Sequence, residues 1–544
     1  MLNPAEPSTG SPQVLVVGAG PVGLTLAHEL LRRGVRVRVV DAAEAPATTS
    51  RAIATHPRTL ETYDQMGVVD EMLARGQRIQ AFTLHHDGRR LARLDADYTQ
   101  MPTRYPFTLC IDQVRTEEVL HAALCAFGVA VEWGVRCEDF EQDADGVDVT
   151  LGTPDGGRES VRVGWLAGCD GGHSTVRKKL AMPLLGKSSD TWLIADADIE
   201  VDLPRNSIHW VRSGGVTLMM VPMSTPGRWR LLDTVSQDGR PAAVAERFSR
   251  ELSRGLGRPV KVAEPVWVSV FTFQQRMIES MRSGRVLLAG DAAHVHSPAS
   301  GQGMNTGVQE AFNLGWKLAM VLHGQADARL LDSYSRERVP IGRALLQSTK
   351  GATFLVQLKN ALAGVALPVV FSVVRAVPAL RVRIQRKVLG GVSGLRVGYP
   401  DSPLTGADTA SGAGPGPGVR VASVRLAADG DPQRTLVDQL RRPVWTLFTS
   451  GAPGERIGAL AESAGDWLET RALHGADTAL AEALGLTLGG WSLVRPDGYV
   501  SARGTGTDPA PLAASLAAAT GRSAPPPHPP GADTPAPAQL RHGG

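Results

Sequence analysis

Two hydrophobic periods alternate at the start of the chain and predict its first elements. Residues 14–17 (VLVV) form a short apolar run that ends at a cluster of glycines. Residues 24–34 (LTLAHELLRRG) carry apolar side chains at helical spacing, and residues 35–41 (VRVRVVD) alternate as a strand does. These pieces predict a β-α-β unit in which the two strands are parallel and the crossover is right-handed.

A second pattern, typical of an antiparallel sheet, extends over residues 187–273. Its apolar runs are short and are separated by Gly, Pro and Asp, as in residues 207–214 (SIHWVRSG). At residues 284–294 (GRVLLAGDAAH) the alternation of strand and helix resumes, with an apolar strand, a glycine turn and then a long helical stretch. We therefore expect residues 1–186 and 274–400 to form one nucleotide-binding domain, with a sheet domain inserted into it.

The C-terminal part is marked by composition as well as by periodicity. Residues 406–418 (GADTASGAGPGPG) predict a linker or a long loop. Strand and helix patterns follow it, so we expect residues 401–521 to form a small α/β domain. Residues 522–544 are rich in proline and carry little apolar bulk. They cannot bury enough surface to offset the entropy of ordering, so they are predicted to be disordered.

Composition and charge restrict the class of protein. Of the 544 residues, 43% are hydrophobic and 20% are charged, and the net charge of +3 is too small to favour nucleic acid as a partner. The four cysteines are scattered without metal-binding spacing, so we expect free thiols in the cytoplasm and no metal site. No secretory signal is visible, and the longest apolar run, residues 361–374, is shorter than the ~20 residues of a membrane span.

A glycine motif, G-x-G-x-x-G, follows the first strand at the mouth of the helix. Its residues are Gly18, Gly20, Pro21, Val22 and Gly23. The first glycine permits a tight turn, the second lets the backbone approach a pyrophosphate, and the third lets the helix pack on the strand. Asp41 ends the second strand, where its carboxylate can accept hydrogen bonds from an adenosine ribose. The motif predicts a dinucleotide, either NAD or FAD.

A second glycine motif decides between these two dinucleotides. Gly290 and Asp291 follow a buried strand, and Asp291 can accept hydrogen bonds from ribitol hydroxyls, which FAD has and NAD lacks. Gly303, Met304 and Asn305 then open a helix, and their free amides can meet the anionic edge of a reduced flavin. The two motifs together predict a non-covalent FAD.

A third motif, residues 168–177 (GCDGGHSTVR), contains Asp170. In this order the three motifs resemble those of the class A FAD-dependent aromatic hydroxylases, in the branch of the phenol hydroxylases and aromatic polyketide hydroxylases. The resemblance implies an α/β fold with a Rossmann-type FAD-binding domain, an inserted antiparallel-sheet substrate domain (187–273) and a C-terminal thioredoxin-like α/β domain. It also implies that Asp170 serves FAD and NAD(P)H, that Arg51 reaches the FAD phosphates, and that Gln113 contacts the flavin or its ribityl chain.

The resemblance implies the reaction as well. NADPH or NADH reduces FAD, the reduced flavin takes up O₂ and forms a C4a-hydroperoxide, and the distal oxygen passes to an aromatic substrate. Ala42 follows Asp41 where the family often has arginine, which leaves the choice between NADPH and NADH open. The C-terminal domain has no cysteine, which excludes a redox role and favours a structural or dimer-interface role.

The residues that act on the substrate carry weaker signals. A phenol attacks more readily once deprotonated, and His56, His294 and His296 lie near the motifs as candidates for the base. The predicted pocket residues are Trp210, Met220, Met223, Phe271, Phe273 and Pro298. They indicate a bulky aromatic substrate, a phenol or polyketide of secondary metabolism, as in antibiotic biosynthesis. A Baeyer–Villiger oxygenase on the same fold and a non-catalytic flavin-binding protein are the alternatives.

Overall fold

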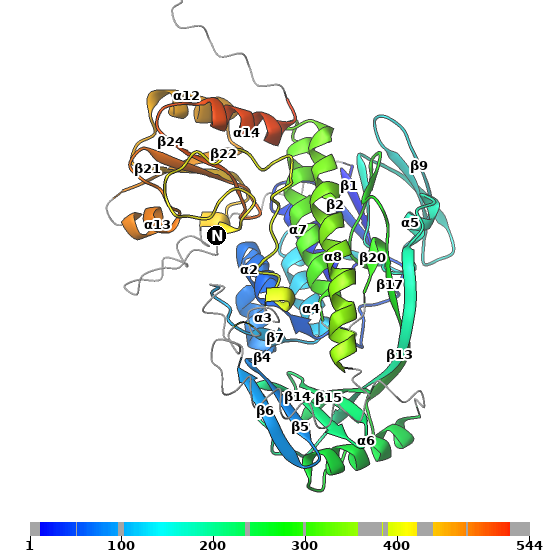
Figure 1. The fold of residues 1–544 in the computed structure, drawn as a ribbon. Helices are drawn as coiled ribbons and strands as arrows, with labels where there is room; N and C mark the ends of the chain where they lie inside the picture. The colour runs from blue at the N-terminus through cyan, green and yellow to red at the C-terminus, as the bar shows by residue number, and fades with distance from the viewer. Residues whose placement is uncertain are drawn as a thin grey trace, which may run out of the picture.

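The computed structural model describes residues 11–50, 52–95, 103–233, 240–296, 301–356, 383, 390–421, 439–474 and 477–522. Three large sheets dominate the described part of the chain, and they have six, eight and four strands. Two long helices, α7 (Gly303–Leu322) and α8 (Asp332–Val356), pack against each other in the middle of the molecule (Figure 1). The four-stranded sheet lies on one side of these helices and the six-stranded sheet on the other (Figure 1).

The six-stranded sheet contains the first glycine motif. Its strands, in spatial order, are β18 (Arg282–Ser283), β19 (Val286–Leu288), β12 (Trp165–Gly168), β1 (Val14–Val17), β2 (Val37–Asp41) and β8 (Val131–Trp133). All neighbours are parallel except β18 and β19. The helix α1 (Pro21–Leu31) joins β1 to β2, which confirms the predicted β-α-β unit. It packs against α7 and α4 (Gln113–Cys125), so β1 is covered and the loop at its end is held between buried elements.

The eight-stranded sheet is mostly antiparallel. Its strands, in spatial order, are β20 (His294–Val295), β17 (Trp267–Met277), β13 (Leu185–Asp198), β16 (Arg228–Asp233), β15 (Val216–Pro222), β14 (Ser207–Ser213), β5 (Ala81–His86) and β6 (Arg89–Asp95). The hairpin β5–β6 extends this sheet, although the sequence placed it in the nucleotide-binding segment 1–186. It joins because β5 pairs in parallel with β14 and satisfies backbone groups that would otherwise form an open edge.

Smaller elements connect the two large sheets. They are β3 (Ala54–Thr55), β4 (Gln77–Ile79), β7 (Thr108–Cys110), β9 (Arg136–Gln142), β10 (Val147–Gly152), β11 (Arg158–Val163), α2 (Pro57–Met66), α3 (Val69–Arg75) and α5 (Thr175–Lys179). The sheet β3-β7-β4 packs one face of the eight-stranded sheet through Ile79 and Cys110. The helix α6 (Pro241–Leu256) covers the opposite face. The eight-stranded sheet therefore presents one face to the nucleotide-binding part.

The C-terminal unit, residues 401–421, 439–474 and 477–522, contains the four-stranded sheet. Its elements are β21 (Trp445–Ser450), β22 (Leu468–Leu473), β23 (Gly490–Val494), β24 (Val500–Thr505), α12 (Glu455–Ala464), α13 (Thr478–Ala483) and α14 (Ala510–Thr520). The strand order is β22-β21-β23-β24, with β21 and β22 parallel and the other pairs antiparallel. Its apolar core includes Trp316 and Met320 of α7, so the unit and α7 share one cluster.

The glycine-rich segment 406–418 lies on the C-terminal unit. Gly406 N and Gly418 N donate to β24 carbonyls at 2.7 and 2.8 Å. A Cβ on Gly412 would lie 1.9 Å from Gly485 O, and one on Gly414 would lie 2.1 Å from Leu484 O. Close approach of two backbones thus explains the glycines. The predicted disordered tail and the apolar run 361–374 fall outside the described residues, apart from Arg522. None of the described helices is long and apolar enough to cross a membrane.

Candidate flavin site

The glycine loop after β1 has the shape of a phosphate cradle. Gly18 has a φ of 107°, and a Cβ on it would lie 2.3 Å from Cys169 O. A Cβ on Gly23 would lie 1.9 Å from Gly18 O, so this glycine lets α1 start close to the loop. A Cβ on Gly20 would meet nothing within 4 Å. Because α1 begins at Pro21 without a side-chain cap, its first amides can bind an anion in that open space.

Asp41 lies at the end of β2, beside this loop. Its Oδ2 accepts a hydrogen bond from Ala19 N at 2.7 Å, and its Oδ1 accepts one from Ala43 N at 2.8 Å. The carboxylate is thereby fixed in orientation, and each oxygen keeps a further acceptor position. This arrangement suits a nucleotide whose pyrophosphate lies on the loop and whose ribose lies at Asp41.

A second cradle lies at the start of α7. Gly303, Met304 and Asn305 form its first turn, and Gln302 at the N-cap position does not cap them with its side chain. A Cβ on Gly303 would meet nothing within 4 Å, so this turn also faces open space. First-turn amides have no carbonyl partner within their own helix and attract negative charge.

The side chains of Asn305 and His56 have structural roles. The Asn305 amide donates to Ala54 O and Gly301 O, both at 2.7 Å, and its Oδ1 accepts from His56 N at 2.8 Å. His56 precedes α2, is 4% exposed, and its Nδ1 lies 3.2 Å from Thr108 Oγ1. These hydrogen bonds connect β3 to α7. The Asn305 side chain is occupied by them, so its backbone amide is the group that can bind a flavin. His56 connects the two elements.

The Gly-Asp turn meets the first glycine motif directly. Gly290 starts the 3-10 helix η1 (Gly290–Ala292) with a φ of 63°, and a Cβ on it would lie 2.9 Å from Val22 Cγ2. The exposed Asp291 follows on the same turn. The two motifs, about 270 residues apart in sequence, are therefore in contact, as a single cofactor spanning both would require.

A buried ion pair between Glu310 and His294 supports the Gly-Asp turn from the side of α7. Glu310 of α7 accepts from Gly290 N at 3.0 Å and from His294 Nε2 at 2.6 Å. Both side chains are fully buried. Burial opposes the charge on His294, but the Glu310 carboxylate outweighs it and raises the pKa of His294 above its ordinary value. A histidine paired with a buried carboxylate in this way supports the turn.

His296 differs from its neighbour. Its ring lies 4.5 Å from that of His294, and both of its ring nitrogens are buried with no hydrogen-bond partner in the described part of the chain. Burial, and then the nearby charge of His294, hold the pKa of His296 well below its ordinary value. The imidazole is therefore held in its neutral form, with two ring nitrogens that no described residue contacts by a hydrogen bond.

The third motif supports the same region. Asp170 Oδ2 accepts from the first two amides of α5, Thr175 N at 2.7 Å and Val176 N at 3.2 Å, beside the N-cap residue Ser174. Arg177 Nη1 donates to Ala292 O at 3.2 Å and so reaches the Gly-Asp turn. Asp170 Oδ1 is buried and has no partner among the residues described. The motif thus both braces the turn and leaves one acceptor for a ligand.

Gln113 binds the chain next to Arg51. Its Oε1 accepts from Ala52 N at 3.2 Å, its own backbone amide donates to Ala52 O at 3.1 Å, and its Nε2 donates to Glu117 at 2.8 Å. Arg51 itself lies outside the described residues. Gln113 is therefore placed to fix the segment that carries Arg51.

The predicted pocket residues divide between the two faces of the eight-stranded sheet. Phe271 packs on the face turned to β3-β7-β4. Strand alternation puts Trp210 on that face too, because its neighbour Val211 packs under α6. Met223 is buried just beyond the end of β15. These three remain compatible with a pocket between the sheet and the flavin cradle. We use this name for the amide turn 303–305 of α7 together with the Gly-Asp turn at Gly290 and Asp291.

Met220 was predicted to line the pocket, but the structure places it on the other face of the sheet. It is fully buried in the cluster beneath α6, beside Phe248, on the face away from the flavin cradle. Its neighbour Met219, which is half-buried, occupies the inner face instead. Composition marked the strand as apolar but could not show which alternate side chains face inward. The Phe273 side chain and Pro298 lie outside what the structure describes.

Asp112 is a residue that the sequence analysis missed. It is the N-cap of α4, yet its carboxylate does not cap the helix, because Ser50 Oγ accepts from Val114 N instead, at 3.2 Å. Its Oδ2 accepts from Ser224 Oγ at 3.2 Å, and its Oδ1 is buried without a partner within the described residues. Burial raises the pKa of Asp112. In sequence, an Asp before a helix looks like an ordinary cap.

Arg230 is the second such residue. It donates twice to Asp196, at 2.7 Å each, and once to Ser50 O, also at 2.7 Å. Its guanidinium lies 5.2 Å from the Trp267 ring centroid. The ion pair links the inner face of the eight-stranded sheet to the segment that precedes Arg51. No local signal reveals it, because its partners, Ser50, Asp196 and Trp267, are far from it in the sequence.

Comparisons with known proteins agree with this geometry. A family model described as the FAD binding domain matches residues 11–349. A 6-methylpretetramide 4-monooxygenase of Streptomyces rimosus is 49% identical over 526 residues, 94% of each chain. The solved structure of the OxyS anhydrotetracycline hydroxylase from Streptomyces rimosus has a TM-score of 0.75 and 31% identity, and covers 94% of this chain and 99% of that one. An aklavinone-11 hydroxylase, solved with FAD and aklavinone, has a TM-score of 0.70 and 26% identity, and covers 95% and 100% of the two chains.

The chain therefore belongs to the FAD-binding-domain family of class A flavin monooxygenases. It is an FAD-dependent aromatic hydroxylase, as the sequence motifs predicted. The residues present fit the cofactor, since open space faces the uncapped amides at Gly20 and Gly303. Within the described residues, no cluster of three or more His, Cys, Asp or Glu could hold a metal ion.

Proposed function

We propose that this enzyme hydroxylates a fused-ring phenolic polyketide of the pretetramide type. The observation that carries the proposal is its likeness to the 6-methylpretetramide 4-monooxygenase, which extends over 94% of both chains. A likeness of this extent includes the sheet domain and the C-terminal unit as well as the cofactor motifs. It therefore supports a shared substrate class in addition to a shared cofactor.

The inner face of the eight-stranded sheet supports a flat aromatic substrate. Trp210, Met219, Trp267 and Phe271 are half-buried, so part of each side chain can contact a ligand. Aromatic rings stack on fused rings, and methionine adapts its shape to them. The unpartnered oxygen of Asp112 adds an acceptor for a substrate hydroxyl at the edge of this face.

When bound, FAD supplies the redox chemistry: it takes a hydride from NADPH or NADH and activates O₂. The protein holds the cofactor through the glycine loop, Asp41 and the amide turn of α7. His296 is the proton acceptor that we assign to the substrate phenol, because both of its ring nitrogens lack hydrogen-bond partners in the described structure. Loss of the phenol proton would make the aromatic ring more nucleophilic.

We assign a thioredoxin-like fold without redox function to the C-terminal unit. The support is its topology, a parallel β-α-β pair followed by an antiparallel hairpin and a terminal helix, together with the absence of cysteine from residues 401–544. It therefore acts through its contacts with the rest of the chain and not through redox chemistry of its own.

The test is oxidation of NADPH and of NADH by the purified holoenzyme with 6-methylpretetramide, with a simple phenol as the control substrate. We expect substrate-stimulated oxidation with the polyketide and a product that gains one oxygen atom as a ring hydroxyl, identified by mass spectrometry and NMR. A product with oxygen inserted between ring carbons would indicate a Baeyer–Villiger oxygenase. A bound flavin with no stimulation by any fused-ring phenol would contradict the proposed substrate class.

A further inference from the structure

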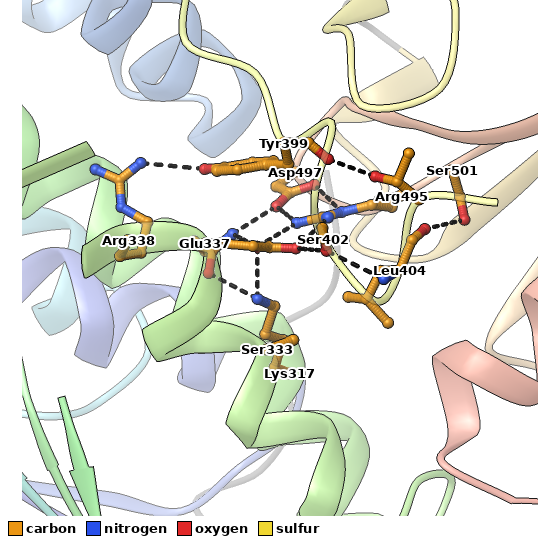
Figure 2. Close-up of polar contacts among 12 residues, drawn as sticks. Lys317, Ser333, Glu337, Arg338, Tyr399, Ser402, Leu404, Arg495, Asp497 and Ser501 are labelled. Carbon is orange, nitrogen blue, oxygen red and sulfur yellow. Dashed lines mark hydrogen bonds and ion pairs between the residues drawn. The ribbon is translucent and has the colours of Figure 1, made fainter. Parts of the chain in front are cut away.

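A buried group of charges joins the C-terminal unit to α7 and α8. Figure 2 shows Glu337 of α8 between Lys317 of α7 and Arg495 of the C-terminal unit. Arg495 donates to the two carboxylate oxygens of Glu337 at 2.6 and 3.0 Å, and Lys317 Nζ donates to Oε2 at 2.7 Å. Arg495 also donates to Asp497, at 2.9 and 2.6 Å. These four side chains are at most 2% exposed.

The charges of this group of four side chains balance, and polar neighbours bind its carboxylates. It contains two cations and two anions, and polar neighbours fill the remaining acceptor positions. Asn313 donates to Glu337 at 2.7 Å and to Asp497 at 3.1 Å, and Ser402 Oγ donates to Glu337 at 2.5 Å. A buried polar group of this kind adds little net stability compared with an apolar core, but it allows only one geometry. It therefore fixes where α8 lies.

The next residue along α8 reaches the flavin cradle. The guanidinium of Arg338 donates to Thr306 O at 3.2 Å and lies 4.0 Å from Glu310 Oε1. Thr306 directly follows the amide turn 303–305, and Glu310 holds the first amide of the Gly-Asp turn. Since Glu337 and Arg338 are consecutive in one helix, the contacts that fix Glu337 also fix Arg338.

The C-terminal unit also contacts the helix α2, through the backbone of Asp497. Arg58 Nη2 donates to Asp497 O at 2.9 Å. Arg58 is in the first turn of α2, which starts directly after His56. The His56 amide donates to Asn305 Oδ1 at 2.8 Å, so α2 is tied in turn to the start of α7. The C-terminal unit thus reaches the cradle from two sides.

We propose that the C-terminal unit positions the flavin site: Arg495 and Asp497 hold α8 and α2 in place, and these helices hold the amide turn of α7 and the Gly-Asp turn. Arg495 and Asp497 are positioning residues, because neither touches the cradle itself. This role depends on the flavin lying against the start of α7, as assigned above. In this way the C-terminal unit, which has no cysteine, affects the flavin site through α8 and α2 without contacting the flavin.

The test compares Arg495→Lys with Arg503→Lys in the holoenzyme. Arg503 is a matched control, because it is also a buried arginine of the C-terminal unit, paired with Asp408 at 2.8 Å within the unit itself. Lysine keeps the charge but loses the planar fork. We expect Arg495→Lys to weaken FAD binding about tenfold. It should also lower the flavin midpoint potential, because looser amides stabilise the reduced anion less. Arg503→Lys should change neither. Ultrafiltration and spectroelectrochemical titration measure both quantities.

Tyr399→Phe is a milder second variant. Tyr399 precedes the C-terminal unit and packs on its Tyr499 at 4.4 Å, and the substitution removes only the hydroxyl that accepts from Arg338 at 3.1 Å. It should lower the potential in the same direction by a smaller amount. If Arg495→Lys and Tyr399→Phe lose thermal stability but keep wild-type FAD affinity and potential, the unit is only a structural attachment and the proposal is wrong. A wild-type protein that binds FAD yet oxidises no polyketide would overturn the proposed substrate, and this comparison would still decide the role of the unit.

Discussion

At the scale of single residues, the three glycines of the first motif have separable roles. Gly18 and Gly23 are required by the backbone, since a Cβ on either would overlap a carbonyl oxygen. Gly20 has a φ of −73° and open space at its Cβ position. We expect Gly20→Ala to fold normally and to weaken FAD binding by ~10–100-fold, the effect of about 1–3 kcal/mol of overcrowding against a bound pyrophosphate. FAD titration of the apoprotein measures this.

Gly18→Ala is the matched control for this prediction. Its φ of 107° and the 2.3 Å approach to Cys169 O should destabilise the apoprotein itself, by more than about 1 kcal/mol. Thermal unfolding of the two apoproteins separates the effects. A Gly20→Ala protein with wild-type FAD affinity would show that the pyrophosphate lies elsewhere.

His296→Gln tests the assigned base. The pKa of His296 lies well below its ordinary value, so its neutral form persists, and the wild-type rate should hold as pH falls past the usual histidine value of about 6.5. Glutamine cannot accept the proton, so kcat should fall by about 10²–10⁴ at neutral pH and recover in part at high pH, where the phenol ionises in solution. FAD content should not change. An unaltered pH profile of kcat would exclude His296.

At the scale of elements, the sequence predicted those parts whose signals are local. The β-α-β unit at residues 14–41 and the turn at Gly290 carry their own spacing and alternation, and both are observed. The pairing of the hairpin β5–β6 with the eight-stranded sheet could not be predicted, because the alternation of a strand does not identify its partner strand. The unpartnered Oδ1 of Asp112, seen among the described residues, could not be predicted, because it depends on Ser50 accepting from Val114 N in place of Asp112.

The strand β15 offers a test at this scale, because adjacent methionines face opposite sides of it. Met220 is fully buried beneath α6, and Met219 is half-buried on the inner face. We expect Met220→Ala to lower the free energy of unfolding by about 2–5 kcal/mol and leave KM unchanged. Met219→Ala should cost little stability and raise KM for the polyketide. Chemical denaturation and steady-state kinetics distinguish them, and an increase in KM for Met220→Ala alone would reverse the assigned faces.

At the scale of the whole molecule, the C-terminal unit is part of the same folded body as the flavin site. Trp316 of α7 packs edge-on against Trp445 of β21 at 5.5 Å, and Trp445 Nε1 donates to Met320 Sδ at 3.3 Å. Arg495, which belongs to the charged group around Glu337, lies 5.4 Å from the centroid of the Trp316 ring. The unit therefore covers both apolar and charged surface of the helices that support the cradle.

Two truncations test this description of the whole molecule. Ending the chain at Arg522 removes only the Pro-rich segment 523–544, so FAD content and thermal midpoint should stay at wild-type values. Ending it at Pro400 exposes Trp316 and leaves Glu337 without Arg495. Breaking a buried ion pair on one side costs about 3–5 kcal/mol, before the exposed apolar surface is added. That is comparable to the stability of many domains, so we expect no soluble flavoprotein. Soluble yield and flavin absorbance measure the result. A soluble, FAD-bound fragment of residues 1–400 would show that α7 and α8 hold the cradle without the C-terminal unit.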